Sequence, residues 1–219
     1  MKNKIVSENV AVSKIKDGDT LLIGGFLGCG TSEKMIDKII EKGIRDLTVV
    51  ANDTGFPDKG NGKLISKKLV KKVVTSHIGT NKETGRQMTE GELEVTLVPQ
   101  GSLAEKIRAG GMGLGAVITP TGVGTEVEEG KQKIELEGRE YLIEMPIRGD
   151  VAILKGSVVD KAGNVYYNGT TKNFQEVMAL AADTVIVEAE KLVETGEIDP
   201  NLIGTPGALV DYIVIGGME

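Results

Sequence analysis

The residue types that build metal sites, disulfides and base-stacking platforms are nearly missing from this chain. Its 219 residues include one cysteine, one histidine and no tryptophan, and aromatic residues make up 3%. One cysteine excludes an internal disulfide and leaves too few ligands for a zinc-type site, so no metal is expected. The few aromatic residues and a net charge of −6, without a basic stripe, argue against a nucleic-acid partner.

Long hydrophobic runs are also missing. No apolar stretch approaches the ~18 residues that a membrane-spanning helix needs, so no membrane partner is expected. Residues 1–18 are too polar for a signal peptide, and a cytoplasmic location is the default expectation. Hydrophobic residues still make up 40% of the chain, enough for one sizeable core, and no linker divides it. We therefore expect a single domain over residues 1–219.

Glycine is what the chain has in excess, with 30 residues that cluster between apolar runs. The stretch DGDTLLIGGFLGCGTS at Asp17–Ser32 has the pattern of a strand, a glycine-rich turn and a helix start. It contains no lysine for a Walker phosphate loop, and Glu33 occupies the third glycine position of a dinucleotide fingerprint. A relaxed fingerprint at Gly111–Ala116 follows a helix and precedes a strand, which is the wrong order. Neither nucleotide motif is therefore expected to operate here.

The hydrophobic pattern predicts alternating strands and helices. We expect strands at 20–26, 46–52, 72–76, 94–99, 116–119, 151–155 and 184–188, and helices at 7–16, 32–43, 102–109 and 173–182. Thr31 is the expected N-cap of the second helix, and Gly110 with Gly111 is expected to close the third. Polar and apolar residues alternate over 133–144, which predicts a hairpin. The expected fold class is α/β, a mostly parallel sheet flanked by helices with an antiparallel insertion.

Polar or glycine-rich segments follow four of the expected strands. They are Gly24–Gly30, Asn52–Gly55, Pro99–Gly101 and Thr119–Thr125. The carboxyl ends of parallel strands meet at one edge of a sheet, where ligands bind. Free N–H groups in the first loop and at the helix start behind it would suit a phosphate, a carboxylate or an oxyanion. Each segment taken alone could also be an ordinary turn.

Motifs along nearly the whole chain resemble those of a known family. In chain order they are DGDTLLIGGFLGCG at 17–30, ANDTG at 51–55, HIGTN at 77–81, GELEV at 91–95, PQG at 99–101, EKIRAGG at 105–111, TGVGT at 121–125, DKAGN at 160–164 and NF at 173–174. Together they are similar to the α subunits of family I coenzyme A transferases, of the acetate/butyrate–acetoacetate (3-oxoacid) type. One departure is Ser32, which stands where the family signature has proline. Serine still permits a helix to start there.

The resemblance implies the fold, the reaction and the partner. It implies an enzyme that moves CoA between a short-chain acyl-CoA (acetyl-, butyryl- or acetoacetyl-CoA) and a free carboxylic acid, by a ping-pong route through a glutamyl-CoA thioester. It places the nucleophilic glutamate on a separate β subunit in an α2β2 heterotetramer. This chain would then carry no catalytic residue and would be active only with its β subunit. The CoA thioester would be the substrate, with no tightly bound cofactor.

The resemblance also assigns site residues. CoA binding falls to the loop after the first strand, namely Gly24, Gly25, Phe26, Leu27, Gly28, Cys29 and Gly30. Asn52, Gln100 and Gly101 would border the pocket for the acyl group and the acid, where side-chain amides could donate to a carboxylate or thioester oxygen. Cys29 invites a nucleophile interpretation, but no histidine is near in sequence and a small residue suits the turn. His77 is expected to be structural, and Arg108 to be a helix-end charge or a phosphate ligand.

Two other functions remain open from the residues alone. A sugar-phosphate isomerase shares this kind of glycine-loop architecture, although it would need an acid–base pair that no Asp, Glu or His cluster supplies. A non-catalytic CoA-sensing or assembly subunit would fail to generate transferase activity with a β chain.

Overall fold

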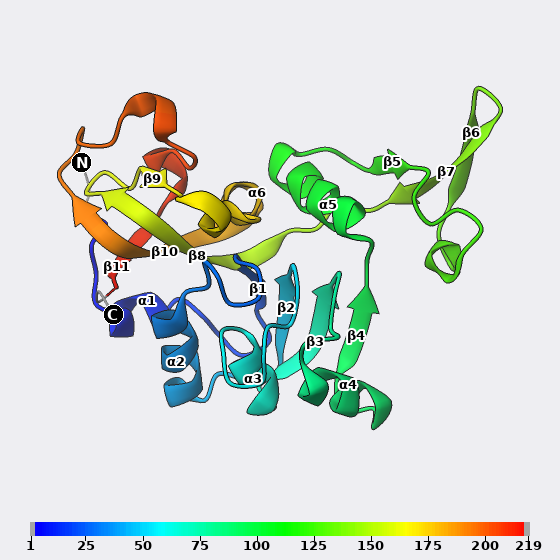
Figure 1. The fold of residues 1–219 in the computed structure, drawn as a ribbon, viewed down its shortest axis with the longest axis horizontal. Coiled ribbons are helices and arrows are strands. Elements are labelled where there is room, and N and C mark those ends of the chain that lie inside the picture. Colours follow the sequence, from blue (N-terminus) through cyan, green and yellow to red (C-terminus); the bar gives the residue numbers. More distant parts are fainter. Residues whose placement is uncertain (1–2, 217–219) are drawn as a thin grey trace.

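The main sheet of the protein is parallel and is covered by helices on both faces (Figure 1). The computed structural model describes residues 3–216. Its eight-stranded sheet runs in the order β11-β10-β8-β1-β2-β3-β4, with β9 antiparallel to β8 and all other pairs parallel. The strands are β1 Thr20–Ile23, β2 Leu47–Ala51, β3 Val70–Thr75, β4 Glu94–Leu97, β8 Gly149–Asp160, β9 Val165–Tyr166, β10 Ala182–Val193 and β11 Tyr212–Ile215.

Two hydrophobic clusters fill the space between the sheet and its helices. One cluster includes residues of α1 (Glu8–Val12), α2 (Glu33–Lys42) and α3 (Gly62–Ser66), and the other includes residues of α5 (Gln100–Met112) and α6 (Gln175–Leu180). Helix α4 (Lys82–Thr89) packs beside α3. Along β1, Leu21 and Ile23 belong to the first cluster and Leu22 to the second. Because side chains alternate between the faces of a strand, a continuous apolar run is what a doubly buried strand requires.

A small antiparallel sheet extends away from the body of the molecule (Figure 1). It consists of β5 (Val117–Thr119), β6 (Lys133–Leu136) and β7 (Arg139–Glu144), in the order β5-β7-β6. The predicted hairpin joins β6 to β7 through Glu137 and Gly138, whose φ angles are 50° and 76°. Positive φ at both central residues is typical of the tight turn that matches strand twist. Short 3-10 turns complete the chain at η1 Glu126–Glu128, η2 Gly169–Lys172, η3 Pro200–Leu202 and η4 Gly207–Leu209.

The predicted end of helix α5 is wrong, and the reason is packing. Gly110 and Gly111 lie inside the helix, which continues to Met112 and ends at Gly113 with φ 70°. A Cβ at Gly110 would lie 2.0 Å from the Ile147 carbonyl oxygen, and one at Gly111 would lie 2.6 Å from the Leu180 Cβ. These two glycines therefore allow close approach of neighbouring segments and do not stop the helix.

The predicted fold class is confirmed, with differences at the level of elements. The sequence interpretation missed α3, α4, β9 and β11, and it placed the ends of β8 and β10 too early. Helix α2 begins after Ser32, not Thr31 as predicted, and ends at Gly43 with φ 66°.

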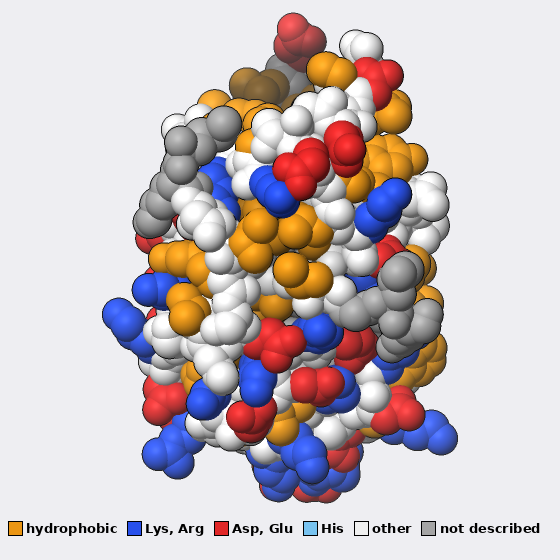
Figure 2. Space-filling model, turned by 90° about the vertical axis from the view of Figure 1, so that its left-hand side faces the viewer, with side chains coloured by type: hydrophobic (Ala, Val, Ile, Leu, Met, Phe, Trp, Pro, Cys, Tyr) orange, Lys and Arg blue, Asp and Glu red, His pale blue; other side chains and the backbone are white. Residues whose placement is uncertain are grey.

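The edge strand β11 lies on the side of the molecule shown in Figure 2. Residues near the N-terminus cover part of this edge, because the Val6 N–H donates to the Ile213 carbonyl and the Ile213 N–H donates to the Lys4 carbonyl. Hydrophobic side chains gather across the middle of this face, and charged side chains are concentrated toward its lower part (Figure 2). Within residues 3–216, no helix combines the length and the hydrophobicity that crossing a membrane requires.

We predict opposite effects for two glycine-to-alanine substitutions in helices. Gly110→Ala should lower the free energy of unfolding by about 1–3 kcal/mol, because the new methyl group would collide with backbone at Ile147. In α4, a Cβ at Gly85 would meet no atom within 4 Å, so Gly85→Ala should raise the free energy of unfolding by about 0.5–1 kcal/mol. Urea denaturation of both variants measures the difference. Equal effects of the two substitutions would contradict the packing role of Gly110.

A buried ion pair joins the small sheet to α5 and makes stability depend on pH. Glu144 accepts hydrogen bonds from Lys106 Nζ at 2.7 Å and Lys131 Nζ at 2.6 Å, and its side chain is 1% exposed. Burial raises the pKa of Glu144, but the two lysines outweigh burial and hold this pKa below its ordinary value. The carboxylate therefore stabilises the fold above the ordinary value of 4.5, and this contribution is lost as pH falls through the lowered pKa.

We predict that Glu144→Gln lowers the free energy of unfolding by about 2 kcal/mol at neutral pH. The difference from the unsubstituted protein should shrink as the pH descends below 4.5. Urea denaturation midpoints of the variant and of the unsubstituted protein, over a series of pH values, measure this difference. Glu140→Gln is the matched control on the same strand. The Glu140 side chain is 54% exposed, and its ion pair with Lys133, 3.4 Å long, is open to solvent. A loss of the same size in this control would refute the role of the buried pair.

Candidate functional site

The glycine loop after β1 folds as a tight turn. The Phe26 N–H donates to the Cys29 carbonyl at 2.9 Å, and the Cys29 N–H donates back to the Phe26 carbonyl at 2.8 Å. The two central residues, Leu27 and Gly28, have φ angles of 50° and 79°. A positive φ at leucine is costly, so neighbouring contacts must hold the turn in place.

Most N–H groups of this loop already have protein acceptors. Gly24 donates to the Ile153 carbonyl and Gly25 to the Asn173 carbonyl, and the Leu27 N–H donates to Asp53 Oδ2 at 2.9 Å. Within residues 3–216, only the N–H groups of Gly28 and Gly30 in the segment 24–30 lack an acceptor. The expectation that the loop backbone as a whole faces a ligand is therefore too broad, because most of its donors hold the turn.

The helix start behind the loop is capped by the protein itself. Glu188 at the end of β10 is 4% exposed, and its Oε2 accepts from Ser32 Oγ at 2.6 Å and from the Lys34 N–H at 3.1 Å. Thr31, the predicted N-cap, instead donates its hydroxyl to the Gly24 carbonyl. A buried carboxylate already occupies the place where an anion was expected at the start of α2. Serine at the family's proline position thus gains a hydrogen bond that proline could not make.

Gln175, which the sequence interpretation missed, fastens the loop to α6. Its Nε2 donates to the Gly30 carbonyl at 2.7 Å, and its Oε1 accepts from the Lys155 N–H at 3.3 Å. A Cβ at Gly24 would lie 2.1 Å from the Gln175 Oε1. Gly24 therefore leaves room for this buried amide. No short-range signal could have found the pair, because the two residues lie far apart in sequence.

A row of polar side chains crosses the carboxyl edge of the sheet beside the loop. Asn52, after β2, donates from Nδ2 to Asn173 Oδ1 at 2.6 Å. Ser76, after β3, lies with its Oγ 2.6 Å from the Asn52 carbonyl oxygen and 2.8 Å from Gln100 Oε1. We call Asn173, Asn52, Ser76 and Gln100 the amide row. The structure thus joins two predicted residues, Asn52 and Gln100, through Ser76, which was not predicted, and Asn173 extends the row beyond Asn52.

The amide row meets the N-terminus of α5. Gln100 is the first residue of this 13-residue helix, and Pro99 caps it without a side-chain hydrogen bond. Within the described chain, the N–H groups of Gly101 and Ser102 have no acceptor. Free N–H groups and the helix dipole favour negative charge at this point. The arrangement can therefore bind a carboxylate or stabilise an oxyanion.

One predicted loop does not belong to this edge. Thr119–Thr125 follows β5, which lies in the small antiparallel sheet and pairs with β7. The expectation that it would line the same pocket as Asn52 and Gln100 is wrong, because strand β5 is not part of the parallel sheet.

A cavity of about 540 Å³ lies at the glycine loop, lined in part by Gly28, Cys29, Gly30 and Thr31. Charged residues of both signs complete its wall: Lys59, Lys63, Lys155, Glu33, Asp37, Asp58 and Glu190. Three ammonium groups against four carboxylates give no excess of positive charge for a phosphate. Cys29 is exposed, with its Sγ 3.1 Å from Thr170 Oγ1.

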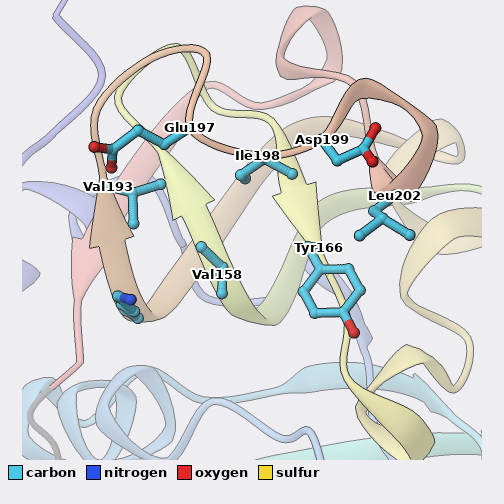
Figure 3. Close-up of a pocket in the computed structure, with 8 residues that line it drawn as sticks. Val158, Tyr166, Val193, Glu197, Ile198, Asp199 and Leu202 are labelled. Carbon is cyan, nitrogen blue, oxygen red and sulfur yellow. The ribbon is translucent and has the colours of Figure 1, made fainter.

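A second cavity of about 520 Å³ lies over β8, β9 and β10 (Figure 3). Val158, Val193, Ile198 and Leu202 form apolar walls, and Glu197 and Asp199 point outward at the rim (Figure 3). None of the predicted site residues lines it.

Comparisons with known proteins agree with this architecture. The family model described as Coenzyme A transferase matches residues 6–216. The "Acetoacetyl-CoA:acetate/butyrate CoA transferase alpha subunit" of Clostridium acetobutylicum is 53% identical over 214 residues, covering 98% of each chain. The "Acetate CoA-transferase subunit alpha" of Escherichia coli K12 is 50% identical, again over 98% of each chain.

Solved structures share the fold at low sequence identity. Glutaconate coenzyme A-transferase from Acidaminococcus fermentans superposes with a TM-score of 0.86 at 22% identity, over 98% of this chain and 76% of that one. An acyl-CoA transferase from Escherichia coli O157:H7, in a thioester complex with CoA, superposes with a TM-score of 0.83 at 22% identity over 98% of this chain. This chain spans 47%, or about half, of that longer chain. The relatives' names do not support the sugar-phosphate isomerase alternative, and the chain belongs to the coenzyme A transferase family.

Proposed function

We propose that this chain is the α subunit of an enzyme that moves CoA between a short-chain acyl-CoA and a free carboxylic acid. The acyl group would be acetyl, butyryl or acetoacetyl. The observation that carries the proposal is the 53% identity, over 98% of both chains, to a relative named as an α subunit of an acetoacetyl-CoA:acetate/butyrate CoA transferase. The amide row beside an uncapped helix N-terminus supplies donors for the carboxylate and the thioester oxygen that such a reaction presents.

The proposed route is ping-pong, with a glutamate of the β subunit as nucleophile. Its carboxylate attacks the thioester carbonyl and expels CoA as thiolate, which leaves an acyl-glutamyl anhydride. The thiolate then attacks the glutamyl carbonyl, so that glutamyl-CoA forms and the first acid leaves. A second acid reverses both steps. Negative charge develops on the carbonyl oxygen in each attack, and this chain would stabilise it.

Within this chain, we assign binding and orientation to the predicted residues. Residues 24–30 would contact CoA, supported by the exposed side chains of Phe26 and Cys29 and by the free N–H groups of Gly28 and Gly30. Asn52, Gln100 and the Gly101 N–H would face the acid and the developing oxyanion, supported by their meeting at one edge of the sheet. No residue of this chain is proposed as the nucleophile, and no metal or tightly bound cofactor enters the route.

The proposed assembly is an α2β2 heterotetramer in the cytoplasm, in which residues 1–219 act as one domain. Support comes from the names of the relatives, which are α subunits or subunits A. A non-catalytic CoA-sensing subunit is the competing function, and reconstitution with a β subunit separates the two.

Reconstitution tests the division of labour. The purified chain should be inactive with acetoacetate and an acyl-CoA, and it should become active when mixed with its β subunit, because only the β subunit supplies the nucleophile. Formation of acetoacetyl-CoA, followed by absorbance, measures the activity. Robust turnover by the chain alone would refute the assignment of the nucleophile, and an inactive mixture would favour the non-catalytic alternative.

Substitution of Gln100 tests the acid site. In the reconstituted enzyme, Gln100→Ala should raise the KM for the acid acceptor about tenfold and leave the KM for acyl-CoA nearly unchanged, because a hydrogen bond to a charged ligand is worth about 1.5–3 kcal/mol. Glu105→Gln is the matched control, since Glu105 lies on the exposed face of the same helix. Equal, negligible effects of Gln100→Ala on both KM values would remove Gln100 from the site.

A further inference from the structure

We propose that Ser76 is a positioning residue that orients the Gln100 amide toward the acid substrate. This inference rests on the proposed function. Ser76 follows β3 directly and is half-buried between Asn52 and Gln100. Its Oγ is the atom that joins the two predicted pocket residues, at 2.6 Å from the Asn52 carbonyl oxygen and 2.8 Å from Gln100 Oε1.

The Ser76 hydroxyl has one proton and three acceptors within reach: the Asn52 carbonyl oxygen, Gln100 Oε1 and, at 3.4 Å, Asn52 Oδ1. The Asn52 carbonyl oxygen already receives the Ser76 N–H at 3.1 Å and the Thr75 hydroxyl at 3.0 Å. Those two donors fill both of its lone pairs. Gln100 Oε1 has no other donor among the described residues. Asn52 Oδ1, at 3.4 Å, lies beyond the ordinary O–H···O distance, whereas Gln100 Oε1, at 2.8 Å, lies within it, so we assign the hydroxyl proton to Gln100 Oε1.

This hydrogen bond decides which end of the Gln100 amide faces the pocket. With Oε1 held by Ser76, Nε2 lies on the opposite branch of the amide, and both of its hydrogens remain available to a ligand. A carboxylate needs donors and is repelled by a carbonyl oxygen. Gln100 is exposed and has no other side-chain hydrogen bond in the described chain, so without Ser76 its amide could turn over freely.

The neighbouring amide is fixed by different contacts. Asn52 is fully buried, and its Nδ2 donates to Asn173 Oδ1 at 2.6 Å. Its Oδ1 is 3.4 Å from Ser76 Oγ, a weaker contact than its 2.6 Å bond to Asn173, so its orientation depends mainly on Asn173. Loss of the hydroxyl should free Gln100 while Asn52 stays in place, so the effect should pass mainly through Gln100.

The test uses the α chain reconstituted with its β subunit. Ser76→Ala should raise the KM for acetoacetate about three- to tenfold, the cost of ordering one free side chain, and leave the KM for acyl-CoA unchanged. Ser76→Thr keeps the hydroxyl and should restore most of the affinity. Ser76→Cys, of similar size but a weak donor, should behave as Ser76→Ala does and guards against a misfolded alanine variant. Ser66→Ala is the control. Ser66 is the last residue of α3, and its hydroxyl donates to the Pro57 carbonyl, so neither group belongs to the amide row.

A double-substitution cycle shows whether Ser76 acts through Gln100. In a Gln100→Ala background, Ser76→Ala should have no further effect on the KM for acetoacetate. Additive effects of the two substitutions, or an unchanged KM in both Ser76→Ala and Ser76→Cys, would overturn the inference about Ser76. If the wild-type enzyme is active in the same assay, the proposed function still stands. An inactive wild-type mixture would overturn both.

Discussion

The segment that leads into α6 crosses the carboxyl end of β1, and the shape of the glycine loop depends on this crossing. Gln175 donates to the Gly30 carbonyl, and the Asn173 carbonyl accepts the Gly25 N–H. Phe174 between them has φ 61°, a conformation that costs about 1–3 kcal/mol for a non-glycine residue and that these contacts must offset. Residue 24 has no side chain because the buried Gln175 amide occupies the space that a Cβ would need.

The protein uses its own carboxylates to satisfy the donors at this end of the sheet. Asp53 accepts the Leu27 N–H, and Glu188 accepts the Ser32 hydroxyl and the Lys34 N–H. Both carboxylates are nearly fully buried. Each would be costly to bury without these partners, so the ligand-binding capacity of the first loop and of the start of α2 is largely consumed by folding. The open donors lie instead at the start of α5, beside the amide row.

Helix α5 connects the site to the small sheet. Its first residue is Gln100, its middle carries Lys106, which pairs with the buried Glu144, and Gly110 near its end lets Ile147 approach closely. The Ile147 N–H also donates to the Lys106 carbonyl. These contacts anchor the second half of the helix, and the hydrogen bond between Ser76 and Gln100 joins its N-terminus to the amide row. A helix anchored in this way can present Gln100 without a cap of its own.

The sequence by itself determined the fold class, the strand–loop–helix order around 17–43 and the presence of Asn52 and Gln100 at strand ends, because hydrophobic period and glycine placement are local signals. It also determined the hairpin over 133–144. Only the tertiary structure decided that Thr119–Thr125 leaves the parallel edge, that Glu188 caps α2, and that Gln175 and Ser76 hold the loop and the amide row. Hydrogen bonds between residues far apart in sequence leave no periodic trace along the chain, so these pairings follow from how the strands are ordered in space.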